Sequence, residues 1–305
     1  MKKICKIVKS IIIEFLIFIK NLGNTKNNKD NIEHESLMLS VGQIQSKLNA
    51  NSKSLNINDY EFKVFSQWGE DGIIDYLVSN LDIKNKTFIE FGVENYKESN
   101  TRFLLLNSNW KGLIFDSSEK NINLIKNSYL YWKFSLTAIR AFINKENINQ
   151  LITNENFEKN VGILSVDIDG NDYWVWKEIN AIDPSIVIIE YNARLGTEKN
   201  YVVPYDKNFE RKKKHHSMIY YGASIKALIK LGKEKGYAFI CCNSSGNNAF
   251  FVKKELLNEN IKEGSIKENF FNNNFRESRD QKGNLTYLDA KSEREIILKL
   301  PLIEV

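Results

Sequence analysis

The stretch GYAFICCNSSGNNAFFV (residues 236–252) decides the fold. Its two apolar runs, residues 237–242 and 248–252, each have the length and composition of a β-strand. Only the turn residues NSSGN (243–247) separate them, so the two strands must run antiparallel. An ordinary doubly wound dehydrogenase sheet ends without such a hairpin. The hairpin therefore predicts a different kind of α/β sheet.

Upstream of the hairpin, from about residue 60, strand-like apolar runs alternate with helical patterns. This alternation is typical of a parallel sheet with helices on both faces. We expect strands at residues 87–92, 112–116, 161–167 and 185–190, and a less clearly marked strand within residues 131–139. Together with the hairpin, they predict a Rossmann-like α/β sheet of seven strands over residues 60–255.

The first 20 residues, MKKICKIVKSIIIEFLIFIK, are basic and apolar. The longest apolar stretch has nine residues and contains Glu14, whereas a spanning helix needs about 20. No small-residue cleavage site follows, which disfavours a signal peptide. As a helix, the segment places one narrow polar stripe among apolar residues. That pattern suits peripheral contact of residues 1–20 with an anionic membrane, or docking on this protein or on a second subunit in a homodimer.

The rest of the N-terminal region, the net charge and the cysteines bear on domain organisation, partners and compartment. Residues 1–22 form the basic apolar helix, and residues 23–59 read as a linker with a short helix marked by Leu37, Val41, Ile44 and Leu48. The net charge is +5, but lysines and arginines are spread among acidic residues, so we expect no nucleic-acid partner. Three cysteines support no disulfide framework, which favours the cytoplasm or the inner face of its membrane.

Acidic residues stand at the ends of four expected strands: Glu90, Asp116, Asp167 and Glu190. In an open parallel sheet, ligands bind beyond the carboxyl ends of the strands. Because burying a carboxylate without a partner is costly, four of them at equivalent positions are hard to explain by packing. The sequence therefore predicts a polar ligand site at this edge of the sheet.

Gly92 and Asp116 have the spacing of a nucleoside site. Gly92 allows close approach of the backbone to a ligand, and Asp116 follows 24 residues later (116 − 92), where a ribose hydroxyl pair is usually held. The turn has one glycine where a dinucleotide fingerprint has three, which favours a ligand without a pyrophosphate. The alternative is that Gly92 makes a plain turn and Asp116 caps the next helix.

A second group of polar residues follows the fourth and fifth expected strands. Asp167, Asp169, Glu190 and Asn192 offer oxygen ligands of the kind that Mg²⁺ or Mn²⁺ prefers, and a metal there would lower the pKa of a bound hydroxyl. Alternatively, they cap the following helices and pair with lysines. The general base is a separate choice, among Asp169, Asp172 and the histidines His215 and His216.

Several motifs, taken in order, resemble FkbM-like methyltransferases, in particular the branch found in bacterial capsule and lipooligosaccharide gene clusters. The motifs are SQWGEDGII (66–74), FIEFGVE (88–94), WKGLIFD (110–116), ENIN (146–149), SVDIDGNDYWVW (165–176), IIEYNA (188–193), YYGAS (220–224) and the 236–252 ending. The resemblance covers roughly residues 60–255 and leaves residues 256–305 without a counterpart. It implies a class I methyltransferase fold that transfers a methyl group from S-adenosylmethionine to a sugar hydroxyl.

Carried over by position, the resemblance assigns roles to individual residues. Glu90, Gly92 and Asp116 would contact S-adenosylmethionine, and we place Gln67 and Ser117 beside them. Asp167, Asp169 and Glu190 would line the side of the acceptor, a sugar or nucleotide sugar. Metal dependence is less well marked than in the metal-dependent macrocin O-methyltransferase group, because Glu-Tyr-Asn replaces paired aspartates after the fifth strand.

Two other functions fit parts of the sequence. Asp167-Ile168-Asp169 after an apolar strand is also a DxD motif, with which metal-dependent glycosyltransferases hold a nucleotide-sugar diphosphate. A non-catalytic membrane-associated scaffold with the same fold is the third possibility. The Gly92–Asp116 pair and the terminal hairpin disfavour the glycosyltransferase, and the four acidic strand ends disfavour the scaffold.

Overall fold

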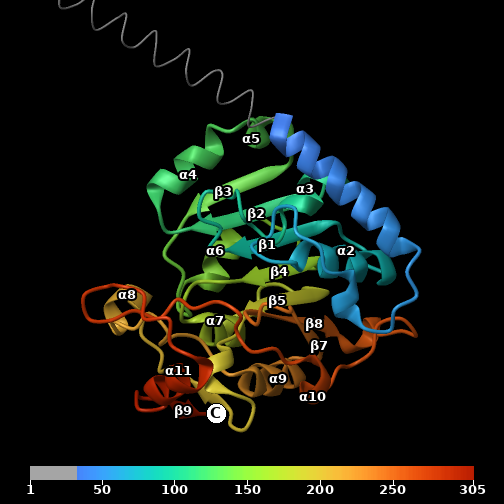
Figure 1. The fold of residues 1–305 in the computed structure, drawn as a ribbon. Helices are drawn as coiled ribbons and strands as arrows, with labels where there is room; N and C mark the ends of the chain where they lie inside the picture. Colours follow the sequence, from blue (N-terminus) through green and yellow to red (C-terminus); the bar gives the residue numbers. More distant parts are fainter. Residues whose placement is uncertain (1–32) are drawn as a thin grey trace, which may run out of the picture.

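The computed structural model describes residues 33–305, so the predictions for residues 1–22 and for Cys5 lie outside the described residues. Within this range, the main sheet has the strand order β3-β2-β1-β4-β5-β8-β7 (Figure 1). Its strands are β1 (Thr87–Phe91), β2 (Lys111–Asp116), β3 (Leu136–Arg140), β4 (Ile163–Val166), β5 (Ile186–Glu190), β7 (Tyr237–Cys242) and β8 (Asn248–Lys253). β8 runs antiparallel to both neighbours, whereas the pairs among β1 to β5 are parallel. The predicted seven-stranded sheet with a terminal hairpin is confirmed.

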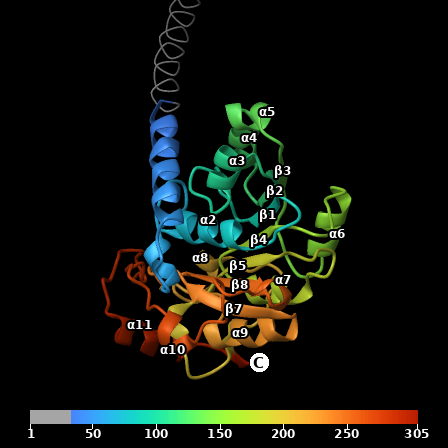
Figure 2. The ribbon, with the colours of Figure 1, turned by 90° about the vertical axis from the view of Figure 1, so that its right-hand side faces the viewer.

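Helices cover both faces of the sheet (Figure 2). The described α-helices with printed bounds are α2 (Glu70–Asn80), α3 (Arg102–Ser108), α4 (Glu119–Lys126), α5 (Tyr129–Lys133), α6 (Ile148–Asn154), α7 (Asp172–Glu178), α8 (Arg211–Lys214), α9 (Ile225–Glu234), α10 (Ile266–Asn269) and α11 (Ala290–Ile297). Short 3₁₀ turns are η1 (Ile57–Tyr60), η2 (Ala193–Leu195) and η3 (Lys254–Leu256), and β6 (Tyr201–Val202) pairs with β9 (Ile303–Glu304) in a small second sheet.

Alternation along the strands divides the core into two apolar clusters. Side chains of α2, α3 and α4 pack on one face of the sheet, and those of α6, α7 and α9 pack on the other. Adjacent strand residues point to opposite faces. Accordingly, Cys241 belongs to the first cluster and Cys242 to the second, both buried and unpaired. Both cysteine side chains therefore contribute to the packing of the core.

A helix over residues 33–50 lies against the α2 and α3 side of the body (Figure 1). Met38 and Leu39 pack against an apolar cluster that includes Phe103, and a Cβ on Gly42 would lie 2.6 Å from the Phe103 ring. The residues that marked this helix in the sequence, Leu37, Val41, Ile44 and Leu48, are exposed. No helix within residues 33–305 has the length and apolarity needed to cross a bilayer.

The C-terminal region, residues 256–305, packs on the same body. β9 pairs with β6, and Arg194 of η2 forms an ion pair with Glu293 of α11 at 2.6 Å between Nε and Oε2. Both side chains are almost fully buried. A buried ion pair that loses one partner leaves an uncompensated charge, at a cost of roughly 3–5 kcal/mol. This pair therefore holds α11 on the sheet edge that carries the site.

Candidate active site

A cavity of about 710 Å³ opens at the carboxyl ends of β1, β2, β4 and β5, where the sequence places the ligand site. Eight of the predicted site residues line it: Gln67, Glu90, Gly92, Asp116, Ser117, Asp167, Asp169 and Glu190. Strands β1 to β5 are parallel, so their carboxyl ends bring these residues to one edge of the sheet. Asn192, His215 and His216 do not line this cavity.

Gly92 follows β1 with φ of +74°, a left-handed conformation that favours glycine. A Cβ built at this position would lie 1.7 Å from the carbonyl oxygen of Asp167. The Gly92 N–H donates to the carbonyl of Phe115 at 2.9 Å. A glycine is therefore needed here for the loops after β1 and β4 to meet. Whether a cofactor also uses this close approach stays a prediction.

Asp116 ends β2 and joins two loops of the cavity wall. Its Oδ2 accepts a hydrogen bond from the Glu94 N–H at 2.8 Å. Its Oδ1 accepts from the Ser118 N–H at 2.8 Å and from Asn121 Nδ2 at 3.2 Å. An ionised carboxylate has about four acceptor positions, so about one is left for a ligand hydroxyl. Asp116 thus has both a structural role and room for a ribose contact.

Glu90 is committed to the protein itself. Its carboxylate accepts hydrogen bonds from the Ser99 and Thr101 hydroxyls and from the Asn100 N–H. Burial raises the pKa of Glu90, although these hydrogen bonds act in the opposite direction. Glu90 therefore orients the loop of residues 99–101 in the cavity wall. Its direct contact with a cofactor stays a prediction, as do those of Gln67 and Ser117, which line the same cavity.

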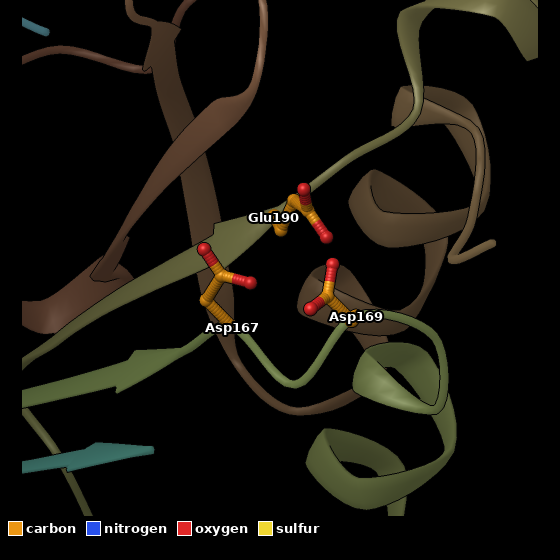
Figure 3. A group of neighbouring side chains, drawn as sticks. All are labelled: Asp167, Asp169 and Glu190. Atoms are coloured by element: carbon orange, nitrogen blue, oxygen red, sulfur yellow. The ribbon is translucent and has the colours of Figure 1, made fainter. Parts of the chain in front are cut away.

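Asp167, Asp169 and Glu190 form an acidic triad whose carboxylate oxygens lie within 4.8 Å of one another (Figure 3). Glu190 is 7% exposed, and its Oε2 has no hydrogen-bond partner within residues 33–305. Burial, and then the charge of Asp169, raises the pKa of Asp167 well above its usual range. Burial and the charge of Asp167 do the same to the pKa of Glu190. Three carboxyl groups this close together are stable only if a bound cation or a proton reduces their mutual repulsion.

The triad fits a divalent cation. Three carboxylates supply the hard oxygen ligands that Mg²⁺ and Mn²⁺ prefer, and the orphaned Glu190 Oε2 is the atom that such an ion would satisfy. Asn192 is a different matter: its Nδ2 donates to the carbonyls of Ile219 and Tyr221, and its Oδ1 accepts from the Arg194 N–H. Its side chain is fully buried in these backbone contacts, which corrects the prediction that Asn192 is a metal ligand.

The histidines do not reach the site. His215 and His216 follow α8 and do not line the cavity; their ring centroids lie 4.2 Å apart, and His215 Nδ1 forms a hydrogen bond with the Ser217 hydroxyl at 2.6 Å. Burial and the neighbouring His216 lower the pKa of His215. The prediction that either histidine is the general base is corrected. Asp172 also stays outside the lining, because its carboxylate accepts from the N–H groups of Ile168 and Gly170.

Arg211 is a site residue that sequence reasoning missed. The run RKKKHH (211–216) has the composition of a solvated loop, and the three exposed lysines of α8 agree with that. Arg211 instead turns into the cavity, where its Nη1 lies 2.8 Å from Asp169 Oδ1 and its Nη2 lies 2.6 Å from Glu277 Oε2. Its guanidinium also lies 3.8 Å from the centroid of the Tyr221 ring. No local signal distinguishes this arginine from its basic neighbours.

The cavity is lined mainly by acidic side chains. Eight carboxyl groups line it: Glu90, Glu94, Glu98, Asp116, Asp167, Asp169, Glu190 and Glu277. Arg211 is the one lysine or arginine among the described lining residues. Clefts lined by one sign of charge raise the local concentration of ligands of the opposite sign. The site is therefore built for a cationic ligand, a metal ion, or both.

The sheet order, with its single antiparallel strand next to the edge, defines a class I methyltransferase fold. Among solved structures, the chain is similar to an O-methyltransferase from Bacillus cereus in complex with SAH (13% identity, 71% of this chain, 90% of that chain, TM-score 0.40). It is also similar to the N-terminal domain of EvdMO1 with SAH bound (10% identity, 62% and 80%, TM-score 0.40) and to a SAM-dependent methyltransferase from Aquifex aeolicus (8%, 59% and 88%, 0.34). No protein-family model and no curated protein matches the sequence. At these identities and scores the likeness adds nothing on activity, and the fold assignment rests on the strand order.

Proposed function

We propose that this chain is an S-adenosylmethionine-dependent methyltransferase that acts on a sugar hydroxyl. The observation that carries the proposal is the acidic cavity at the carboxyl ends of a class I methyltransferase sheet. S-adenosylmethionine has a sulfonium and an ammonium group against a single carboxylate, so its net charge is positive. A dinucleotide or a sugar nucleotide carries a diphosphate, which the ionised carboxylates among these eight groups would repel. Charge thus favours S-adenosylmethionine over the competing ligands.

The cavity has a place for each end of the cofactor. The acceptor position left on Asp116 would take a ribose hydroxyl. Ala141, Phe142 and Ile143, which directly follow β3, line the same cavity, and Phe142 is 43% exposed. A flat apolar surface beside the ribose position suits an adenine ring. The sulfonium would then lie toward the acidic residues that follow β4 and β5.

The acidic triad would act on the acceptor. A sugar hydroxyl is a poor nucleophile at neutral pH, so a positioned base must take up its proton. In the proposed step, the acceptor oxygen attacks the methyl carbon, the carbon–sulfur bond breaks, and the cofactor leaves as neutral S-adenosylhomocysteine. The proton passes to a carboxylate, for which Asp167 and Asp169 are the candidates. A divalent ion, when bound by Asp167, Asp169 and Glu190, would lower the pKa of the hydroxyl.

The biological setting follows from the sequence resemblance. The motifs resemble FkbM-like enzymes of capsule and lipooligosaccharide clusters, so we place the acceptor in bacterial surface polysaccharide. Peripheral membrane contact through residues 1–20 and a homodimer remain part of this proposal, on sequence grounds alone.

Calorimetry with S-adenosylhomocysteine, UDP and GDP, each with and without Mn²⁺, tests the proposal. We expect S-adenosylhomocysteine to bind in the micromolar range, and neither nucleotide to bind. Binding of a nucleotide diphosphate only with Mn²⁺ would favour the DxD glycosyltransferase. Binding of none of them would favour the scaffold.

A further inference from the structure

Residues 270–280, here called the wall segment, contribute side chains to the wall of the cavity. The segment belongs to the C-terminal region, which has no counterpart in the motif series. It is attached to the turn of the β7–β8 hairpin: the Asn274 N–H donates to the Ser245 carbonyl at 2.9 Å, and Asn274 Nδ2 donates to the Ser244 carbonyl at 2.8 Å. Two of its side chains, Phe275 and Glu277, line the cavity. The wall segment is therefore part of the site.

Phe275 adds an aromatic side chain to the cavity wall. Its ring stacks on the indole of Trp68, with centroids 5.6 Å apart and an angle of 18° between the planes. The guanidinium of the buried Arg194 lies 5.4 Å from the Phe275 centroid. Both contacts restrict the Phe275 ring. Trp68 and Phe275 together present flat aromatic surface in a cavity otherwise rich in carboxyl and amide groups.

Glu277 forms ion pairs with two arginines, Arg211 and Arg194. Its Oε2 lies 2.6 Å from Arg211 Nη2, and its Oε1 lies 3.1 Å from Arg194 Nη1. Arg211 is held from its other side by Asp169. The guanidinium that faces the triad is thus already paired with two carboxylates. An anionic acceptor would find no free cation among the described lining residues.

We propose that the wall segment selects the acceptor, and that this acceptor is a sugar ring without phosphate or carboxylate groups. The flat aromatic pair would pack against the apolar C–H face of the ring, while the hydroxyl rim would face the carboxylates. The neighbouring carboxylates repel an acid on the sugar. The inference rests on the proposed function. In it, the sheet edge binds the cofactor, and the wall segment, which lies outside the core fold, contacts the acceptor and determines which sugar binds.

A glycan array with neutral, amino, uronate and phosphorylated sugars tests the inference, using the full chain with and without S-adenosylhomocysteine. We expect the wild-type protein to bind neutral or amino sugars. Phe275→Leu keeps apolar volume but loses the flat ring, and it should weaken this binding at least fivefold. Tyr287→Leu is the matched control, since Tyr287 lies in the same C-terminal region, exposed and outside the cavity lining. Glu277→Gln should admit uronates, because it releases Arg211 from one of its two carboxylates.

Each result of this array decides the proposal. Binding of no sugar, binding of acidic sugars alone, or undiminished binding by Phe275→Leu would overturn it. S-adenosylhomocysteine affinity, measured by calorimetry on the same variants, should be unchanged; a parallel loss would assign the wall segment to the cofactor instead. If S-adenosylhomocysteine fails to bind the wild type while sugars bind as expected, the proposed function fails and the sugar site stands.

Discussion

The guanidinium Nη1 of Arg211 lies 2.8 Å from Oδ1 of Asp169, across 42 residues of sequence. Asp169 is one of three carboxylates whose oxygens converge within 4.8 Å. Arg211 therefore holds one ligand of the triad, while Glu190 Oε2 has no partner within residues 33–305. A divalent ion that used all three carboxylates would have to compete with this arginine.

Arg211→Gln should increase the affinity for Mn²⁺ about fivefold. Asp169 is largely exposed, and a partly exposed ion pair contributes up to about 1 kcal/mol. Titration of Mn²⁺ followed by electron paramagnetic resonance measures the change. Arg140→Gln, which removes an exposed pair with Glu119 away from the triad, is the control and should bind Mn²⁺ like the wild type. Equal affinities in all three proteins would mean that Arg211 and the ion do not compete.

Asp116→Asn should weaken S-adenosylhomocysteine binding at least tenfold. A hydrogen bond to a charged group is worth roughly 1.5–3 kcal/mol, and the acceptor position left on Asp116 is the one assigned to the ribose. The amide oxygen can accept from only one of the Glu94 and Ser118 N–H groups, because these donate to different carboxylate oxygens, so thermal unfolding must first show that the variant stays folded. Calorimetry measures the affinity, with the exposed Asp82→Asn as control. An unchanged dissociation constant would place the ribose elsewhere.

The fold was predictable because its signals are local. The hairpin of residues 236–252 shows its antiparallel turn within a few residues, and the four acidic strand ends follow from topology once the strands are recognised. The third strand was less well marked: it runs over Leu136–Arg140 and so extends one residue beyond the expected range of 131–139. Strand residues point alternately to the two faces, which explains why the adjacent Cys241 and Cys242 lie in different apolar clusters.

The site was only partly predictable, since its missing members come from distant chain segments. Arg211 meets Glu277 across 66 residues (277 − 211), and nothing near either residue marks that contact. Asn192 was misassigned for a local reason: η2 starts directly after it and turns its amide toward the backbone of residues 219–221. His215 and His216 were chosen for their ordinary pKa, but the chain beyond α8 leads them away from the cavity.

Gly92→Ala should destabilise the protein far more than a substitution at an open glycine. The conformation at φ of +74° costs an alanine roughly 1–2 kcal/mol, and its Cβ would in addition lie 1.7 Å from the Asp167 carbonyl oxygen. Gly283 is the matched control, with φ of +85° and no atom within 4 Å of a Cβ. Chemical denaturation should show a clearly larger loss of unfolding free energy for Gly92→Ala. Equal losses would mean that the loop moves freely.

Asp71 should make the protein less stable as the pH rises from about 4 to about 7. Its carboxylate is buried and accepts hydrogen bonds from the Val64, Phe65 and Ser66 N–H groups, yet burial raises its pKa from 3.8 to about 6. The folded state thus binds the proton more tightly, so this contribution is complete below 3.8 and is lost as the pH rises through about 6. Two pKa units correspond to roughly 3 kcal/mol.

Asp71→Asn isolates this contribution. Its oxygen can replace Oδ2, which accepts all of these hydrogen bonds, while Oδ1 has no partner within residues 33–305. The difference in unfolding free energy between variant and wild type should therefore shift by a few kcal/mol across this pH range. Parallel pH profiles for the two proteins would show that Asp71 does not titrate in this window.

Asp167→Asn should reduce turnover roughly 10²-fold or more and leave S-adenosylhomocysteine affinity within a few-fold. The substitution keeps the shape of the side chain and removes its charge, so it affects deprotonation of the acceptor, whereas the methyl donor is already activated and needs mainly orientation. Asp183→Asn, outside the cavity, is the control. Methyl transfer to the sugar that the array identifies, followed by mass spectrometry, measures turnover.

The same assay tests the role of a metal. Loss of activity in EDTA and its recovery with Mg²⁺ or Mn²⁺ would assign the deprotonation to a metal-bound hydroxyl. EDTA-resistant activity would leave a carboxylate as the base, with Asp169 next to be substituted. Full turnover by Asp167→Asn would remove the acidic triad from the chemistry.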